Sequence, residues 1–204
     1  MWTTNRATKT WNFSPKPIDM RYPLLLVALL PFLLNAQHLN LKKISLVEWG
    51  SGRPVSVADL AQGKPTVLLT LATECPICQK YAGTLPDLAA AYPQVAFIGV
   101  FTKWEDTTLI QPFVRDYNLP FPITTDPKHR LIKSLKTEVT PEAFLVSPDG
   151  NVRYRGSIND WFAGLGKYRT VVTQEYLRNA LDEYLAGKVV SLPQTKAIGC
   201  MFAR

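Results

Sequence analysis

Cysteine, histidine and charged residues are all scarce in this sequence. Three cysteines and two histidines occur among 204 residues, and Asp, Glu, Lys and Arg together make up 19%. Three cysteines are too few for a small domain held together by disulfides. The net charge of +7 is not gathered into a basic run, which argues against nucleic-acid binding. Since 47% of the chain is hydrophobic, a disordered, collagen-like or low-complexity chain is excluded as well.

The sequence also lacks an apolar run long enough to span a bilayer, which needs about 20 residues. Its longest apolar stretch, residues 22–34, follows Met20 and a basic residue and is interrupted by two prolines. A positive start, a short apolar stretch and a small residue such as Ala36 are typical of a secretory signal peptide. We therefore expect residues 1–36 to be an N-terminal extension and signal peptide, with translation starting at Met20. The mature protein is then secreted across the cytoplasmic membrane, to the periplasm, and meets the membrane only through the signal segment before cleavage.

Strand and helix patterns alternate along the rest of the chain. Periodicity and turn residues predict strands over 45–49, 66–72, 95–101 and 121–125, helices over 79–92, 106–117, 128–135 and 173–186, and a hairpin over 143–155. Pro86 is expected to kink its helix, and residues 121–125 to form an edge-like strand. Asp106 is expected to cap the helix over 106–117, and Thr173 to cap the last helix. The fold class predicted is α/β, with a central mixed β-sheet flanked by helices.

Two of the cysteines, Cys75 and Cys78, form a Cys-Pro-Ile-Cys motif where a buried strand leads into a helix. Residues i and i+3 of a first helical turn lie about 5–6 Å apart, within the Cα separation of a disulfide. The helix dipole and free N–H groups favour a thiolate at the first cysteine. We therefore predict that Cys75 is an exposed nucleophile and Cys78 the resolving thiol. Pro76 suits the first helical position because it has no N–H to satisfy.

Other interpretations of the pair stay open. A structural zinc site would need two more ligands, and the remaining Cys and His residues are Cys200, His38 and His129. Two buried, unreactive thiols would also fit the spacing. A purely structural disulfide across so short a loop is the third alternative, although it would restrain the unfolded chain little.

Three segments resemble the thioredoxin fold superfamily, on its secreted bacterial redoxin branch of the TlpA and AhpC/TSA type. Residues 71–81 resemble the strand and active-site turn of that family, and residues 139–156 resemble its cis-proline loop and the following hairpin. The end of the chain, 186–200, is similar to the tails of bacterial redoxin-domain proteins. The resemblance implies that residues 40–201 form one thioredoxin-like redoxin domain.

The resemblance implies roles for individual residues. Cys75 and Cys78 match the redox-active pair, and Pro141 matches the cis-proline that faces it. Thr140 matches the residue whose backbone pairs with a bound substrate chain. We expect Pro76, between the two cysteines, to belong to the same substrate-binding surface.

The chain departs from the family pattern next to its cysteines. Leu69 stands where many thioredoxins bury a carboxylate, and Glu74 stands where an aromatic residue usually precedes the nucleophile. A carboxylate beside Cys75 disfavours its thiolate and opposes the helix dipole. Glu74 and Glu142 are possible acid/base groups, with solvated loop carboxylates as the alternative interpretation.

These features together favour an extracytoplasmic thiol–disulfide oxidoreductase that uses the cysteine pair on protein disulfides. The implied partners are protein thiol or disulfide substrates and an unidentified electron donor or acceptor. We expect no nucleic acid, no cofactor and no bound metal. One alternative is a peroxiredoxin-like thiol peroxidase with antioxidant activity, although Ala72 stands where such enzymes carry threonine. A non-catalytic metal-handling or binding module on the same fold is the other.

The third cysteine, Cys200, has no assigned partner in the sequence. If Cys75 and Cys78 bond to each other, Cys200 is a free thiol. Otherwise it is an accessory thiol, acting as a second resolving cysteine or as a partner of another chain. The question becomes whether Cys200 approaches Cys75 in the fold.

Overall fold

A computed structural model describes residues 37–102 and 105–202, so the predicted signal peptide and Met20 lie outside the described residues. In the described part of the chain no helix is both long and apolar enough to cross a membrane. The strands are β1 Ser45–Glu48, β2 Pro54–Ser56, β3 Thr66–Leu71, β4 Ala96–Thr102, β5 Ile123–Asp126, β6 Val139–Thr140, β7 Ala143–Val146, β8 Val152–Gly156, β9 Phe162–Gly164, β10 Lys167–Tyr168 and β11 Cys200–Met201. The helices are α1 Val57–Ala61, α2 Pro76–Ala82, α3 Leu85–Ala91, α4 Thr107–Asp116, α5 Arg130–Leu135 and α6 Tyr176–Leu185.

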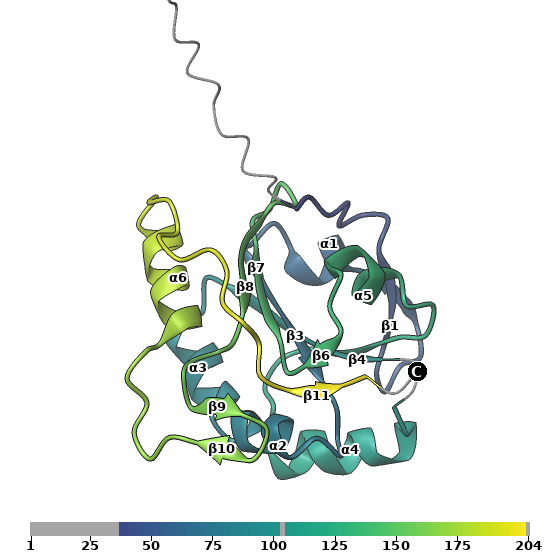
Figure 1. The fold of residues 1–204 in the computed structure, drawn as a ribbon. Helices are drawn as coiled ribbons and strands as arrows, with labels where there is room; N and C mark the ends of the chain where they lie inside the picture. Colours follow the sequence, from purple (N-terminus) through teal and green to yellow (C-terminus); the bar gives the residue numbers. More distant parts are fainter. Residues whose placement is uncertain (1–36, 103–104, 203–204) are drawn as a thin grey trace, which may run out of the picture. The chain divides into compact units, whose positions relative to one another are not determined.

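The central sheet has seven strands in the order β2-β1-β5-β4-β3-β7-β8 (Figure 1). β3, β4 and β5 are parallel, whereas β1, β2, β7 and β8 pair antiparallel with their neighbours. The prediction of a mixed sheet flanked by helices is confirmed. The prediction of an edge strand near residues 121–125 is wrong, because β1 pairs with the free side of β5 and β2 pairs with β1.

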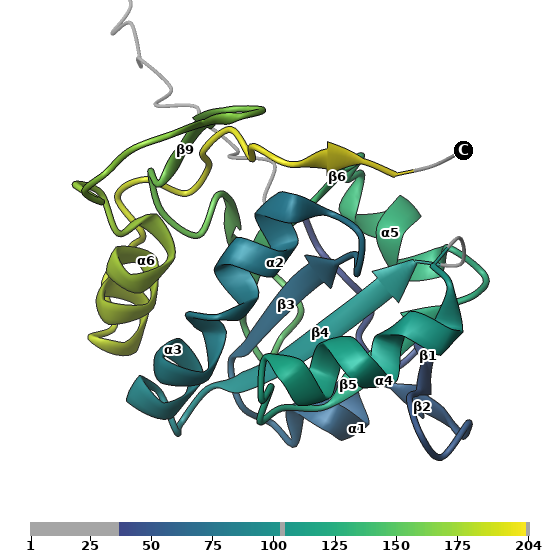
Figure 2. The same ribbon diagram turned by 90° about the horizontal axis from the view of Figure 1, so that it is seen from below.

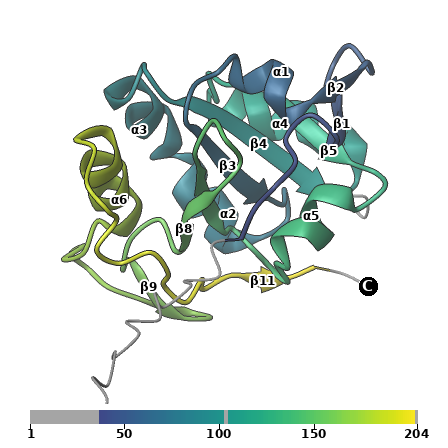
Figure 3. The same cartoon turned by 90° about the horizontal axis from the view of Figure 1, so that it is seen from above.

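Both faces of the sheet are covered, which explains the unbroken apolar runs in its central strands. In β3, Val67, Leu69 and Leu71 pack with residues of α2, α3, α4 and α6. Leu68 points to the opposite face, where it packs with residues of α1 and α5. Figure 2 shows α2, α3 and α4 over one face, and Figure 3, from the opposite side, shows α5 over the other. β3 is therefore buried throughout and forms a fixed base for the loop that follows it.

The helix expected over residues 79–92 is in fact two helices. α2 ends at Ala82 and α3 begins at Leu85, with Gly83 and Thr84 between them. Pro86 lies in the first turn of α3, where a missing N–H breaks no hydrogen bond. Pro86 therefore begins a new helix instead of kinking a long one.

The two predicted helix caps have different outcomes. Asp106 caps α4, and its carboxylate accepts a hydrogen bond from the Thr108 N–H at 2.9 Å. Thr173 does not cap α6, because its N–H donates to the Asp160 carboxylate at 2.8 Å and its hydroxyl donates to the same group. The residue at the N-cap position of α6 is Glu175.

The C-terminal segment runs as an extended chain past β8 and ends beside β6, drawn in yellow in Figure 1. It passes so close to Gly156 that a Cβ atom there would overlap Thr195. Gly156 also has a φ of +140°, which L side chains rarely adopt. At its end, β11 pairs antiparallel with β6. This short pairing brings Cys200 and Met201 to the loop that contains Pro141.

Candidate active site

The Cys-Pro-Ile-Cys motif lies at the C-terminal end of β3, where the chain turns into α2. Cys75 is the N-cap residue of α2, and Pro76 opens the helix with its side chain exposed. Two side chains hold the turn at Thr73. The Thr73 N–H donates to the Glu105 carboxylate at 2.7 Å, and the Gln79 side-chain amide donates to the Thr73 carbonyl at 2.8 Å. These bonds fix the direction in which the chain reaches Cys75.

Cys75 forms a disulfide with Cys200, 125 residues further along the chain. Their Cα atoms are 6.0 Å apart, within the range of about 4.4–6.8 Å that disulfides span. Among the alternatives open for Cys200, the structure selects a bond to Cys75 of the same chain. The prediction that Cys75 is exposed is wrong for this oxidised state, since only 3% of its surface remains accessible beside the bonded tail.

Cys78 is a free, fully buried thiol one helical turn after Cys75. Loss of hydration raises the pKa of Cys78 to about 12, and the negative charge of Glu105 adds to this effect. Hydrogen bonds with Thr140 and with the Ala72 backbone act in the opposite direction, but they are weaker than the effect of burial. Cys78 is therefore held as a neutral thiol at neutral pH.

Thr140 contacts both cysteines of the motif. Its carbonyl oxygen lies 3.4 Å from Sγ of Cys75, and its Oγ1 lies 3.2 Å from Sγ of Cys78. The peptide bond from Thr140 to Pro141 is cis, as the family resemblance implies. The structure thus brings together the predicted residues Cys75, Cys78, Thr140 and Pro141, with Cys200 as a fifth member of the cluster.

The backbone beside Thr140 is occupied by the protein's own C-terminus. Cys200 lies opposite Thr140 in the antiparallel pair of β6 and β11, and the Phe202 N–H donates to the Glu138 carbonyl at 3.1 Å. Gly199 lies so close that a Cβ atom there would overlap the Thr140 carbonyl oxygen. The position where the resemblance puts a substrate chain is therefore filled by β11.

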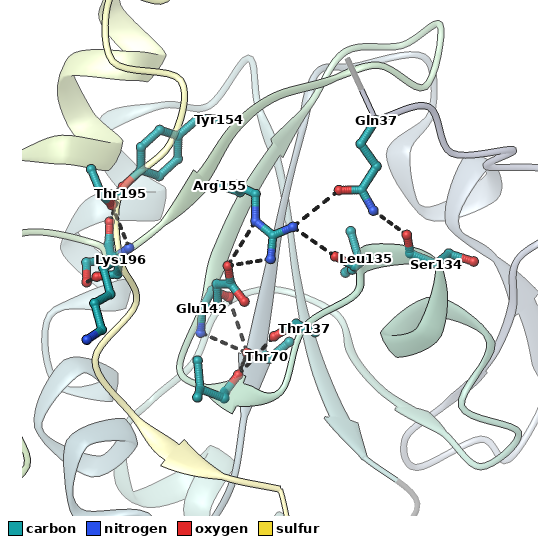
Figure 4. A network of polar contacts seen from close by, with 12 residues as sticks. Gln37, Thr70, Ser134, Leu135, Thr137, Glu142, Tyr154, Arg155, Thr195 and Lys196 are labelled. Atoms are coloured by element: carbon teal, nitrogen blue, oxygen red, sulfur yellow. Dashed lines mark hydrogen bonds and ion pairs between the residues drawn. The ribbon is translucent and has the colours of Figure 1, made fainter. Parts of the chain in front are cut away.

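The two carboxylates proposed as acid/base groups have different surroundings. Glu74 is exposed beside Cys75. Glu142 is only 4% exposed, so its interpretation as a solvated loop carboxylate is wrong. Arg155 donates to one Glu142 carboxylate oxygen from Nη2 at 3.0 Å and from Nε at 3.2 Å (Figure 4). Glu142 directly follows the cis-proline, and Arg155 belongs to β8. Their ion pair therefore links the cis-proline loop to β8.

Sequence reasoning missed Glu105 and Arg155. Glu105 lies 32 residues from Thr73. Arg155 lies 13 residues from Glu142, within the segment that resembles the cis-proline loop and hairpin, but no local pattern marked the contact between them. Thr70 was also missed, although its hydroxyl accepts a hydrogen bond from the Glu142 N–H at 2.8 Å. Within residues 37–102 and 105–202, no group of three His, Cys, Asp or Glu side chains is placed to hold a metal ion.

Comparison with known families identifies the chain. The AhpC/TSA family profile matches residues 36–155, which is more than half of the sequence. The chain belongs to the AhpC/TSA family. The part that matches this family includes both cysteines of the motif and the cis-proline loop. Cys200 lies beyond the matched residues.

Individual relatives of this AhpC/TSA family member share parts of its sequence and its fold. The soluble secreted antigen MPT53 of Mycobacterium tuberculosis is 45% identical over 71 residues, 35% of this chain and 40% of the relative. The chain thus matches less than half the length of that relative. A crystal structure of a secreted Mycobacterium tuberculosis disulfide oxidoreductase homologous to Escherichia coli DsbE is 27% identical, with a TM-score of 0.50 over 72% of this chain and 95% of that one.

A third relative resembles more of the structure. A conserved protein from Geobacillus kaustophilus superimposes with a TM-score of 0.72 over 82% of this chain and 92% of its own, at 23% identity. At that identity the likeness concerns the fold alone. The thioredoxin-like fold predicted from the sequence is confirmed.

Proposed function

We propose that this protein is an extracytoplasmic thiol–disulfide oxidoreductase that acts on protein disulfides through Cys75 and Cys78. The observation that carries the proposal is a disulfide at Cys75, beside a cis-proline loop and next to a free second thiol. The similarity to a secreted disulfide oxidoreductase supports the reaction class. The similarity to a secreted antigen and to that secreted oxidoreductase supports a location outside the cytoplasm.

In the reductive direction, the reaction begins at Cys75. Its thiolate attacks one sulfur of a substrate disulfide, so a bond from Cys75 to that sulfur forms while the substrate disulfide breaks. The other substrate sulfur leaves as a thiolate and takes a proton. Backbone groups of Thr140 are positioned to pair with the substrate chain, and the exposed Pro76 borders the same surface.

The mixed disulfide is then resolved by Cys78. Its Sγ loses a proton and attacks Sγ of Cys75, which releases the second substrate sulfur as a thiolate. The two cysteines have given up two electrons and hold the new disulfide, while the substrate is fully reduced. Oxidation of a substrate dithiol follows the same steps in reverse.

The test is reduction of insulin disulfides by dithiothreitol, with and without the protein. Cys75→Ser is expected to abolish the catalysed rate, because Cys78, the other cysteine of the motif, is fully buried and cannot attack a substrate disulfide directly. Lys80→Gln, on the exposed side of α2, is the matched control and keeps the activity. Full activity of Cys75→Ser would overturn the proposal.

Substrates can be captured with a variant that forms mixed disulfides but does not resolve them. Since Cys200 already bonds to Cys75, the trap requires the double substitution Cys78→Ser with Cys200→Ser. Covalent adducts through Cys75 are expected to accumulate and to identify the substrates. Complete absence of adducts under oxidising extraction would favour the non-catalytic binding module instead.

A thiol peroxidase is the second candidate, because the Cys75–Cys200 disulfide is also a product that peroxide would give. The Cys75 thiolate would attack a peroxide oxygen to form a sulfenic acid and hydroxide, and the Cys200 thiol would then form the disulfide and release water. Ala72 in place of threonine argues against efficient peroxide binding. Consumption of hydrogen peroxide that depends on Cys75 would favour this candidate.

A further inference from the structure

We propose that β11 is a built-in substrate of the active site and that Cys200 is a third redox-active cysteine, which exchanges with Cys78 for the bond to Cys75. The proposal rests on the oxidoreductase function proposed above and adds the resident occupant of its substrate site.

β11 is bound in the way that this site binds a protein substrate. A protein substrate of this site must lie as an extended chain along the residue before Pro141 and present a sulfur to Cys75. β11 does both: it pairs antiparallel with β6, with Cys200 opposite Thr140, and Cys200 is bonded to Cys75. The segment therefore has the backbone and covalent contacts of a substrate in a mixed disulfide.

Hydrogen bonds to β8 and the residue after it anchor the chain just before β11. The Arg155 N–H donates to the Pro193 carbonyl at 3.0 Å, and the Thr195 N–H donates to the Arg155 carbonyl at 3.0 Å. The Thr195 hydroxyl lies 2.7 Å from the Tyr154 hydroxyl and accepts from the Ser157 N–H at 3.0 Å (Figure 4). These bonds hold the chain just upstream of the reactive segment. A cysteine tethered in this way stays near Cys75 at an effective concentration on the order of millimolar.

The reactive end of the segment is less tightly held than its anchor. Thr195 alone takes part in three hydrogen bonds through its N–H and hydroxyl, whereas Met201 is 68% exposed. In the described part of the chain, residues 198–202 are held by the disulfide, by the pairing with β6 and by packing of the partly buried Ile198 and Cys200 side chains against the core. When the disulfide opens, β11 can therefore leave Thr140 while the upstream anchor remains in place.

The exchange needs no external oxidant or reductant. A Cys78 thiolate attacks Sγ of Cys75, the Cys75–Cys200 bond breaks and the Cys75–Cys78 bond forms. Cys200 leaves as a thiolate and takes a proton, so the protein still holds one disulfide and one thiol. β6 then becomes free to pair with an external chain.

Gly199 indicates which external chains fit. A Cβ atom at this position would overlap the Thr140 carbonyl oxygen and come within 3.1 Å of the Pro141 nitrogen. Both are backbone atoms, which cannot rotate aside as the end of a side chain can. The site therefore takes extended segments in which glycine directly precedes the reactive cysteine.

Disulfide mapping of the oxidised full-length protein is the first test. Free thiols are alkylated under denaturing conditions and the non-reduced digest is analysed by mass spectrometry. We expect the wild type and Gly164→Ala, an exchange at an uncrowded glycine of β9, to contain Cys75–Cys200 with Cys78 alkylated. Gly199→Val should shift the bond to Cys75–Cys78 and leave Cys200 alkylated. A wild type that contains Cys75–Cys78 and a free Cys200 would overturn the proposal.

The second test follows a substrate from capture to release. The probe is a synthetic peptide with the sequence of residues 196–202, whose cysteine is bonded to 5-thio-2-nitrobenzoate, and it is added to reduced full-length Cys78→Ser. Attack by Cys75 releases the coloured leaving group and forms a peptide adduct, which Cys200 should then displace. In Cys78→Ser with Cys200→Ser the adduct should persist at least about ten-fold longer, because the tethered thiol is gone. The same peptide with valine in place of glycine should react several-fold more slowly.

The outcomes of this test separate the two proposals. Adducts that form and are equally long-lived with and without Cys200 would overturn the built-in substrate and leave the oxidoreductase intact. If no adduct forms at Cys75 in either variant, the oxidoreductase proposal fails. Release of the peptide from Cys78→Ser together with formation of Cys75–Cys200 would support both.

Discussion

At the scale of single residues, the two cysteines of the motif are in opposite situations. Cys75 lies at the start of α2, where another chain can reach its sulfur, and in this state the chain that reaches it is the protein's own C-terminal segment. Cys78 lies inside α2 without solvent contact, with Thr140 as its polar neighbour. Burial makes Cys78 a poor nucleophile at neutral pH, since only the thiolate attacks. Because Cys78 is a poor nucleophile at neutral pH, Cys200 can compete with it for the disulfide bond to Cys75.

The raised pKa of Cys78 predicts a loss of stability in alkali. Below pH 9.0, the ordinary pKa of the thiol, the folded and unfolded chains both keep the proton, so this group does not change stability with pH. Between pH 9.0 and about 12 the unfolded chain ionises while the folded one does not. The free energy of unfolding should therefore fall in this interval, by up to about 1.4 kcal/mol per pH unit.

Urea unfolding of the oxidised protein at a series of pH values measures this effect. Tyr81 and Tyr154 also have pKa values raised by burial, so part of the alkaline loss belongs to them. The comparison with Cys78→Ala isolates the thiol, because the variant lacks it and keeps both tyrosines. Identical slopes above pH 9.0 in the two proteins would contradict the assignment of the raised pKa to Cys78.

Thr140 offers a second prediction at this scale. Its hydrogen bond lowers the pKa of Cys78 and so partly offsets the burial. Thr140→Val keeps the shape of the side chain and the backbone pairing but removes the hydroxyl, so the pKa of Cys78 should rise further. Titration of thiolate absorbance in the oxidised protein would measure the change, and a pKa that stays the same or falls would contradict it.

At the scale of elements, the cis-proline loop is held by β8 and α5. Arg155 of β8 pairs with the buried Glu142 and also donates to the Leu135 carbonyl at the end of α5, at 3.2 Å (Figure 4). The Thr70 hydroxyl on β3 bonds to the Glu142 backbone on the other side. The loop that carries Thr140 is thus fastened to three elements, which keeps its backbone in place for a paired chain.

Removal of Arg155 should weaken this region strongly. Arg155→Met leaves the Glu142 carboxylate buried without its partner, which is expected to lower the free energy of unfolding by about 3 kcal/mol. Arg153→Met on the same strand is the matched control. Its pair with Asp149 is exposed and 3.7 Å long, so the loss there should stay below about 1 kcal/mol. Urea unfolding would test both, and equal losses would contradict the role of the buried pair.

At the scale of the whole molecule, the disulfide ties the C-terminus to the centre of the chain. It joins residues 125 apart, whereas a Cys75–Cys78 bond would close only a short loop. A longer closed loop restricts the unfolded chain more, so the Cys75–Cys200 form should be the more stable of the two oxidised forms. The oxidised form in which β11 occupies the substrate site is therefore also the more stable of the two.

Cys200→Ser tests this difference. Under oxidising conditions the variant is expected to lose about 2–4 kcal/mol of unfolding free energy relative to the wild type. With dithiothreitol present the two proteins should unfold at nearly the same urea concentration, because neither then has a disulfide. A difference that persists after reduction would mean that the substitution acts through packing.

Much of the architecture could be predicted from local sequence, because the signals that determine it are local. Apolar runs identified β3 and β4, turn residues identified the β7–β8 hairpin, and Asp106 marked the start of α4. The break between α2 and α3 could not be placed, because Pro86 fits a kink and a helix start equally well in a linear pattern. Residues 200–201 carry no strand pattern at all, since β11 exists only through its pairing with β6.

The sequence by itself determined the α/β fold class and the place of the Cys-Pro-Ile-Cys motif at a strand–helix junction. Both follow from hydrophobic spacing and from residues close together in the chain, whereas the thioredoxin-like arrangement was implied by the family resemblance. Only the tertiary structure decided that Cys75 bonds to Cys200 and that Glu142 is buried against Arg155. These pairings depend on the path by which distant segments return to the cis-proline loop, and that path follows from packing of the whole molecule.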